Sequence, residues 1–317
     1  MMECWIRLGD GSALTLPAAL EWKFSYGTGL PCDSFYVRCL WESGRERDLS
    51  DAALFYAQWQ GERVFTGVVD EFACVCGREG LHLELSGRGM AARLLDNEAM
   101  PCQYQRMTCA DLIARHIKPY GIRTVGGKDL PAVSGFSVPS GASQWSVVED
   151  YAAYYGGVIP RFDRMGRLVL DPHPDDRVVE IGPSAAVKQW EYREQRYGVL
   201  SRVAVRQRSS WETCWTEDPA FLARGGCASR VITVPNDTGD VAMRYSADYQ
   251  LKASRREQVR LTMTLPGAFL AWPGDLVEVN RSKFGGNGRY RVARTEVVCS
   301  EAGLFTTLEL GEPDSMI

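Results

Sequence analysis

The sequence has no long hydrophobic run and no recognisable targeting segment. A membrane-spanning helix needs about 20 consecutive apolar residues, and no stretch of the 317 residues approaches that length. The opening residues, MMECWIRLGDGS, lack the basic region and apolar core of a secretory signal. We therefore expect a chain that folds in a cytoplasm and does not insert into a membrane.

An excess of positive charge is also missing. The chain has 36 Lys and Arg against 40 Asp and Glu, for a net charge of −4 and a pI near 5.6. A protein whose main task is to grip nucleic acid usually carries a basic excess. The charge balance therefore argues against specific nucleic-acid recognition, although it leaves open a lumen through which DNA passes.

The sequence contains ten cysteines but no C-x-x-C pair, which zinc ribbons and fingers require. Cys74 and Cys76 fall inside a strand pattern, where residues two apart point the same way, and we expect both to be small buried residues. We interpret the cysteines as structural thiols rather than metal or redox groups. They are Cys4, Cys32, Cys39, Cys74, Cys76, Cys102, Cys109, Cys214, Cys227 and Cys299.

Only three histidines are available for catalysis or metal binding. His82 lies in an alternating strand pattern, and we expect it on the polar face. His116 lies near the end of a helical stretch, where a cation is favourable against the helix dipole. His173 lies between two prolines that hold the segment extended, which favours a turn over a metal-binding loop. We predict no metal and no cofactor.

Motifs for nucleophilic catalysis and phosphate binding are missing too: there is no G-x-S-x-G elbow and no G-x-x-x-x-G-K-[ST] loop. The paired carboxylates of glycoside hydrolases meet in space, so the sequence leaves them open. Glu46, Asp48 and Asp51 form one acidic group, and Glu149 and Asp150 form another. Neither group has a distinctive context, and we predict that the chain is not an enzyme.

What is present is organised around two similar hairpins. Residues 65–100 read FTGVVDEFACVCGREGLHLELSGRGMAARLLDNEAM, with leucines alternating with polar residues after a turn-prone CGREG. Residues 290–312, YRVARTEVVCSEAGLFTTLELGE, repeat the strand, the polar turn ending in Gly303 and the alternating strand. Such alternation is typical of half-buried antiparallel strands. Two copies of one hairpin predict two related β-domains.

The length also favours several domains, because single cores usually stop growing at roughly 250–300 residues. We predict a mainly β fold with a small α/β insert and two related tube-like β-barrel domains. The first barrel is placed at residues 1–99, the insert at 100–175 and the second barrel at 176–317. A capping-box pattern at Thr108 and helical spacing up to Tyr155 indicate the insert's helices.

The second β-domain carries further features. Residues 242–258 have the pattern of one helix, and residues 207–230 form a polar excursion that contains Trp211 and Trp215. Two aromatic residues in a polar loop can anchor a partner or stack on a sugar. They can equally hold the loop against the barrel, which is the interpretation we favour, since loop aromatics often do so.

The order of these elements resembles the baseplate hub proteins of contractile-tailed phages and related particles. The likeness is carried by FTGVVD…GLHLELSGR running into MAARLLDNEAM, then GGVIPRFDRMGRLVL, SRREQ and AWPGDLVEVN…GRYRV…AGLFTTLELGEP. It covers nearly the whole chain, with no counterpart for residues 209–228. The resemblance implies a homotrimer in which each subunit contributes two tube-like barrels. The resulting ring would adapt the sixfold tail tube to the threefold spike.

The leading hypothesis is therefore a non-enzymatic hub that contacts itself, the tail tube protein, the central spike protein and baseplate wedge or tape-measure components. Such a protein would be assembled in the host bacterial cytoplasm and would reside in a virion or phage-tail-like particle. The alternative is a carbohydrate- or cell-wall-binding tail-associated β-protein, possibly hydrolytic, that uses the aromatic loop at Trp211 and Trp215.

Overall fold

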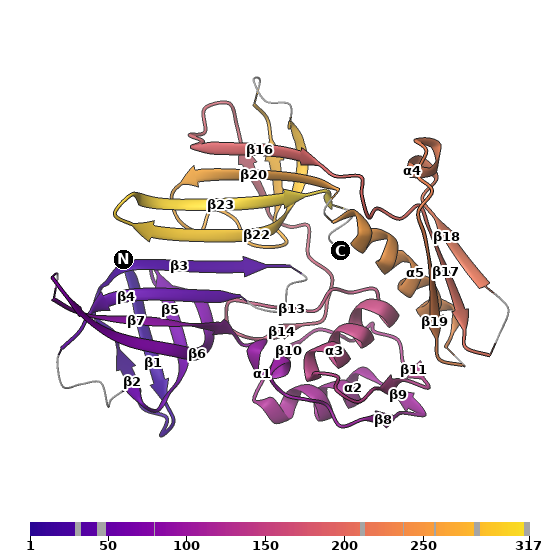
Figure 1. Ribbon diagram of the computed structural model, residues 1–317, viewed down its shortest axis with the longest axis horizontal. Helices are drawn as coiled ribbons and strands as arrows, with labels where there is room; N and C mark the ends of the chain where they lie inside the picture. The colour runs from indigo at the N-terminus through magenta and orange to yellow at the C-terminus, as the bar shows by residue number, and fades with distance from the viewer. Residues whose placement is uncertain are drawn as a thin grey trace.

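The computed structural model describes residues 1–28, 33–42, 49–78, 80–209, 213–236, 238–256, 258–281 and 286–313. Strands make up most of its regular structure, as the alternating patterns predict (Figure 1). Two β regions lie one above the other, a small α/β insert lies beside the lower one, and a separate small sheet lies at the far side. None of the described helices combines the length and apolar character needed to cross a bilayer.

The N-terminal lobe is built from the first seven strands. Its sheet follows the order β3-β4-β7-β6-β5-β1-β2, and every neighbouring pair is antiparallel. The predicted opening hairpin is confirmed as β1 and β2. The strands are β1 (Met2–Leu8), β2 (Ala13–Thr15), β3 (Ala19–Gly27), β4 (Ser34–Leu40), β5 (Ala52–Trp59), β6 (Glu62–Gly77) and β7 (Gly80–Gly89).

The insert follows β7 and has its own hydrophobic cluster around Leu112, Tyr151 and Leu168. Thr108 caps its helix α2 in a full capping box with Asp111, as predicted. Its elements are α1 (Ala92–Leu95), β8 (Cys102–Gln103), β9 (Arg106–Met107), α2 (Cys109–Leu112), η2 (Ile113–Ile117), η3 (Lys118–Tyr120), β10 (Thr124–Val125), β11 (Val133–Ser134), β12 (Ser137–Val138), α3 (Gln144–Glu149), η4 (Asp150–Tyr155), β13 (Arg161–Phe162) and β14 (Leu168–Val169).

The C-terminal lobe continues the same sheet. Its strands follow the order β16-β20-β23-β22, with β21 beside β22 and β15 beside β21, and β22 pairs with β3 of the N-terminal lobe. The described strands of the two lobes thus form one 13-stranded sheet, so the closure of two tube-like barrels stays a prediction. The strands are β15 (Val178–Ile181), β16 (Gln189–Glu194), β20 (Val259–Pro266), β21 (Leu276–Val279), β22 (Gly288–Ser300) and β23 (Gly303–Gly311).

The polar stretch that the sequence suggests as an excursion is largely folded. Three strands form a separate sheet in the order β18-β17-β19, and α5 packs on it through Met243, Ala247 and Leu251. This side sheet has its own hydrophobic cluster, which the sequence patterns did not predict. Its elements are β17 (Arg202–Gln207), β18 (Thr213–Glu217), α4 (Pro219–Ala223), β19 (Ser229–Val234) and α5 (Asp240–Arg255).

The two hairpins that organise the sequence match in register. In each, the last residue pair of the ladder is three positions apart in the sequence, and its glycine has a positive φ, +101° at Gly80 and +112° at Gly303. In each, seven residue pairs separate the turn from a β-bulge in the first strand. The bulges leave out Asp70 in β6 and Ala293 in β22. A turn and a bulge at the same spacing make Cys76 equivalent to Cys299.

The equivalence extends to five strands in each lobe. The order β3-β4-β7-β6-β5 in the N-terminal lobe corresponds to β16-β20-β23-β22-β21 in the C-terminal lobe, with every pair antiparallel. Trp22 of β3 and Trp190 of β16 occupy the same position in this register. The lobes differ beyond the fifth strand, because β1 is antiparallel to β5 whereas β15 is parallel to β21.

Candidate functional site

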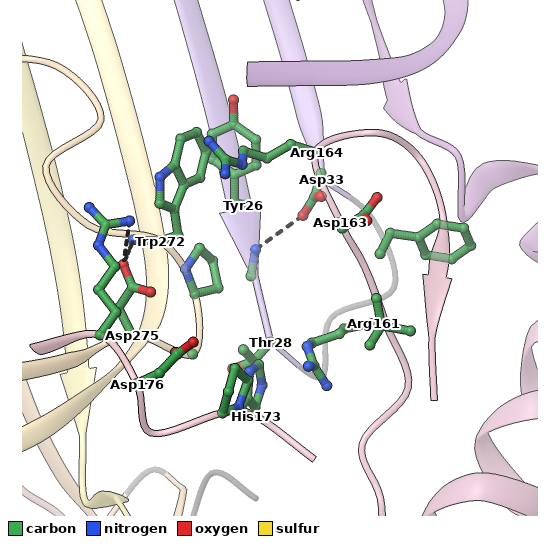
Figure 2. Close-up of a pocket in the computed structure, with 17 residues that line it drawn as sticks. Tyr26, Thr28, Asp33, Arg161, Asp163, Arg164, His173, Asp176, Trp272 and Asp275 are labelled. Atoms are coloured by element: carbon green, nitrogen blue, oxygen red, sulfur yellow. Dashed lines mark hydrogen bonds and ion pairs between the residues drawn. The ribbon is translucent and has the colours of Figure 1, made fainter. Parts of the chain in front are cut away.

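A pocket of about 400 Å³ lies where the two lobes and the insert meet (Figure 2). The end of β3 and Asp33 form one side, the β13–β14 turn forms another, and the loop before β21 closes it. The charged and aromatic residues that line it are Tyr26, Asp33, Arg161, Asp163, Arg164, His173, Asp176, Arg177, Trp272 and Asp275.

The pocket's side chains tie the three parts of the chain together. The Arg164 guanidinium of the insert lies 4.6 Å from the ring centre of Trp272, a cation–π contact. Arg177 forms a 3.1 Å ion pair with Asp275, whose carboxylate also accepts a 2.8 Å hydrogen bond from the Trp272 backbone N–H. The Tyr26 ring of the N-terminal lobe meets the Trp272 ring of the C-terminal lobe edge-on, with the ring centres 5.0 Å apart. These contacts give the pocket a clear structural role.

Burial changes the charge state of several groups here. It raises the pKa of Asp33 to about 7, and a 3.1 Å hydrogen bond from the Gly27 N–H only partly offsets this. Burial, followed by the nearby Arg161 and Arg291, lowers the pKa of His173 to about 3. His173 is therefore a neutral imidazole at physiological pH.

Nothing in the described part of the chain groups three or more His, Cys, Asp or Glu side chains as metal ligands. Glu149 and Asp150 lie where α3 continues into η4, outside the pocket, and burial raises the pKa of Asp150 to about 6. Asp51 is exposed, whereas Glu46 and Asp48 lie outside the described residues. Of the residues in these two groups that the structure describes, Asp51, Glu149 and Asp150, none lines the junction pocket.

The two other histidines differ from expectation. His82 is only 4% exposed, because Leu40 and Val75 flank it on the neighbouring strands and cover the outer face of β7. His116 is 5% exposed, with its ring nitrogens 2.9 Å from the Tyr104 hydroxyl and 2.8 Å from the Gln144 side-chain oxygen. Burial lowers its pKa, so the predicted cation at a helix end is wrong.

The structure describes one residue of the aromatic pair proposed as a partner-contact loop, Trp215. Trp211 lies outside the described residues. Trp215 is on β18, in line with Ala204 of β17 and Val231 of β19, and is 53% exposed. Val231 is 62% exposed. Trp215 therefore does not hold this stretch against a barrel; it forms part of an exposed apolar strip on the side sheet.

Two strand edges are exposed that the sequence analysis did not predict. β16 pairs only with β20, and no described strand lies along its other edge. The second half of β6, beyond its bulge, pairs only with β7. Cys76 lies on this second edge and is exposed, so the prediction that it is a small buried residue is wrong. The stretch QWEYRE shows two large aromatic residues, Trp190 and Tyr192, but nothing in it indicates that its strand lies at an edge.

No protein-family model matches this sequence, and no curated protein matches it by sequence. Solved structures match well. A tail protein of Neisseria meningitidis is 21% identical with a TM-score of 0.78, and 99% of each chain is covered. The 43 kDa tail protein of prophage MuSo2 from Shewanella oneidensis is 17% identical with a TM-score of 0.76, and all of each chain is covered.

A third match is an Escherichia coli component of the type VI secretion system, described as structurally similar to the T4 tail proteins gp27 and gp5. It is 10% identical, with a TM-score of 0.60 over 93% of this chain and 73% of that one. At such identities the likeness concerns the fold. The fold expected from the residue order is confirmed: this chain has the fold of solved phage tail proteins.

Proposed function

We propose that this chain is a structural subunit of a phage or phage-like tail, located at the hub of the baseplate. The observation that carries the proposal is the internal repeat: two lobes share five strands in the same order, with the same turn and bulge spacing. The shared fold with solved tail proteins supports it.

The mechanism of such a hub is geometric. Three subunits with two similar lobes each would present six similar units around an axis, which suits a junction between a sixfold tube and a threefold spike. The subunits would form a closed homotrimeric ring. Its partners would be the tail tube protein, the central spike protein and wedge or tape-measure components, assembled in a bacterial cytoplasm and retained in the particle. The chain itself would perform no catalysis.

Native mass spectrometry or light scattering on the purified protein tests this proposal, together with binding assays against tube and spike components. We expect a trimer, or a monomer that becomes a trimer when one of these components is added. A protein that remains monomeric and binds neither component would contradict the proposal.

The side sheet is a second proposed contact surface, since Trp215 and Val231 are exposed together on one face. We expect Trp215→Ala to weaken binding to a tail component while changing the free energy of unfolding by less than about 0.5 kcal/mol, as for exposed positions in general. Incubation with peptidoglycan tests the alternative function. Binding that is lost in Trp215→Ala would favour a cell-wall-binding protein over a contact with another tail component.

A further inference from the structure

One strand contact joins the two lobes. The second half of β22 pairs with β3 over six antiparallel residue pairs, from Arg294 opposite Gly27 to Cys299 opposite Trp22. The first half of β22 pairs with β21 instead, so the strand changes its partner along its length. One central pair of this contact is fully buried: Val297 lies opposite Phe24, and both are 0% exposed.

The internal repeat contains the same two edges a second time. β6 is equivalent to β22, and β16 is equivalent to β3. Like β22, the strand β6 pairs with a neighbour, β5, only along its first half. The second half of β6 and the outer edge of β16 have no strand opposite them in the described chain. In Figure 1 these two edges lie on opposite sides of the molecule, so one chain cannot pair them with each other.

Both edges carry exposed large apolar side chains among charged ones, and two of these correspond to fully buried residues at the internal contact. Phe72 and Val75 of β6 are 37% and 45% exposed, and Tyr192 of β16 is 42% exposed. Tyr192 corresponds to the fully buried Phe24, and Phe72 corresponds to the fully buried Thr295. Open strand edges with large apolar side chains are a liability unless another chain covers them.

We propose that β16 of one subunit pairs with the second half of β6 of a second copy, in the register of the internal β22–β3 contact. This proposal rests on the self-assembly proposed above and specifies its contact. The strands would run antiparallel, and residues opposite each other would point to the same face. The opposing pairs would be Cys76 with Trp190, Val75 with Glu191, Cys74 with Tyr192, Ala73 with Arg193, and Phe72 with Glu194.

Charge supports this register. At the internal contact, Nη2 of Arg294 lies 3.3 Å from the Ser25 hydroxyl, so side chains at these two positions touch. The equivalent positions between copies hold Glu71 and Arg193, which have opposite charges. Arg193 also lies directly opposite Arg260 of β20, whose charge is paired with Glu309 at 3.8 Å. Glu71 of a second copy would supply a carboxylate for Arg193.

The contact is head-to-tail, because it joins two different edges. Repetition of such a contact generates a closed ring when the rotation closes, whereas a twofold contact would stop at a dimer. Each subunit would offer one β16 edge and receive one β6 edge. The boundary between subunits would then repeat the boundary between lobes, so that similar strand contacts recur around the whole ring.

Thiol cross-linking tests the register, because Cys76 is exposed and free. Opposing residues of antiparallel strands place their Cβ atoms about 4.5–5.5 Å apart, within reach of a short thiol-bridging reagent. We expect Trp190→Cys to give covalent dimers and trimers on a denaturing gel. We expect the same of the double variant Val75→Cys/Glu191→Cys, which tests a neighbouring pair on the other face without removing Trp190.

The matched controls are the wild-type chain, Glu191→Cys alone, and Trp190→Cys combined with Cys76→Ser, none of which should form covalent trimers. Native mass spectrometry of the same samples separates the two proposals. If a trimer forms but neither designed pair cross-links, the proposed strand register is wrong, whereas the proposed trimeric ring stands. A monomer that forms no cross-link even in concentrated solution, with tail components added, would overturn both. Covalent dimers without trimers would contradict a head-to-tail contact.

Discussion

In the N-terminal lobe, phenylalanines lie opposite glycines on neighbouring strands: Phe35 opposite Gly87, and Phe55 opposite Gly67. The rings of Phe35 and Phe55 stack with their centres 3.8 Å apart. At the equivalent positions of the C-terminal lobe, Leu261 lies opposite Leu310 and Val277 lies opposite Tyr290.

The two lobes thus share one fold but fill its core with different combinations of side chains. In the first lobe, a large ring on one strand fills the space left by a residue without a side chain on the next, an arrangement known to support glycines in sheets. In the second, the volume is shared more evenly between the strands. Total core volume matters more to a fold than its distribution among side chains. Strand order and register can therefore persist while the core sequence diverges.

The largest effect is expected at Gly87. A Cβ added there would lie 2.0 Å from the Val68 carbonyl oxygen and 2.7 Å from a ring carbon of Phe35. Because backbone cannot move aside easily, we expect Gly87→Ala to lower the free energy of unfolding by at least about 3 kcal/mol. Gly77 in the same hairpin has nothing within 4 Å of an added Cβ, so Gly77→Ala is the control. Equal urea midpoints for the two variants would contradict this account of the glycines.

Leu85 and Leu308 are equivalent and almost fully buried, at 1% and 0% exposed. Truncation of either to alanine should cost about 2–5 kcal/mol through lost burial and a residual cavity. If the lobes are equivalent units, hydrogen exchange should show faster amide exchange chiefly in the mutated lobe. If amide exchange became faster only in the N-terminal lobe in both variants, the two lobes would not be equivalent folding units.

Asp33 belongs to the N-terminal lobe alone and gives a pH-dependent prediction. Its folded pKa of about 7 lies above the ordinary value of 3.8, so the folded state binds the proton more tightly than the unfolded state. Its burial therefore destabilises the protein increasingly as pH rises from about 4 to about 7, and fully above that. Asp33→Asn should gain up to about 4 kcal/mol above pH 7 and nothing below pH 4.

Thermal denaturation of the two proteins across this pH range is the measurement. A difference in Tm that stays constant with pH would contradict the titration of Asp33. The Asn side chain retains an oxygen that can accept the Gly27 N–H, so loss of this hydrogen bond does not confuse the comparison.

The smallest loss of stability is expected at Arg88. Its side chain binds the bulge residue of β6, Asp70. Arg88 pairs with the bulge residue Asp70 at 2.7 Å and with Asp96 of the insert at 2.7 Å. These bonds raise the pKa of Arg88 and lower that of Asp96. Arg88 and Asp70 are about one-third exposed and Asp96 is 54% exposed, so Arg88→Met should cost only about 1 kcal/mol. A loss that does not shrink in high salt would argue against an ionic contribution.

Much of the fold could be read from the sequence. Alternation and glycine-ended turns predicted both hairpins, and the capping residues predicted the start of α2, because these signals are local. The side sheet was missed because β18 lies in a polar stretch with no clear alternation. Its strands are stabilised by packing against α5, a contact between distant parts of the chain.

The candidate surfaces were less predictable. His82 and His116 belong to polar positions by pattern, yet neighbouring strands and helices bury them. Conversely, Cys76 was expected to be buried and is exposed, because its strand lies at an open edge. Tyr192 is exposed for the same reason. Which edges stay open depends on the order of strands in the sheet, and no local signal reports that order. The internal repeat became informative only after the register of both lobes was known.

The central claim is that the chain is a repeat of two equivalent lobes whose internal contact is repeated between copies. A reconstruction of the assembled oligomer by electron cryomicroscopy tests it most directly. The account predicts a closed ring of three chains with six alternating lobes, in which Tyr192 of one subunit lies opposite Cys74 of the next. A ring in which β16 faces solvent, or a dimer with twofold symmetry at this edge, would contradict it.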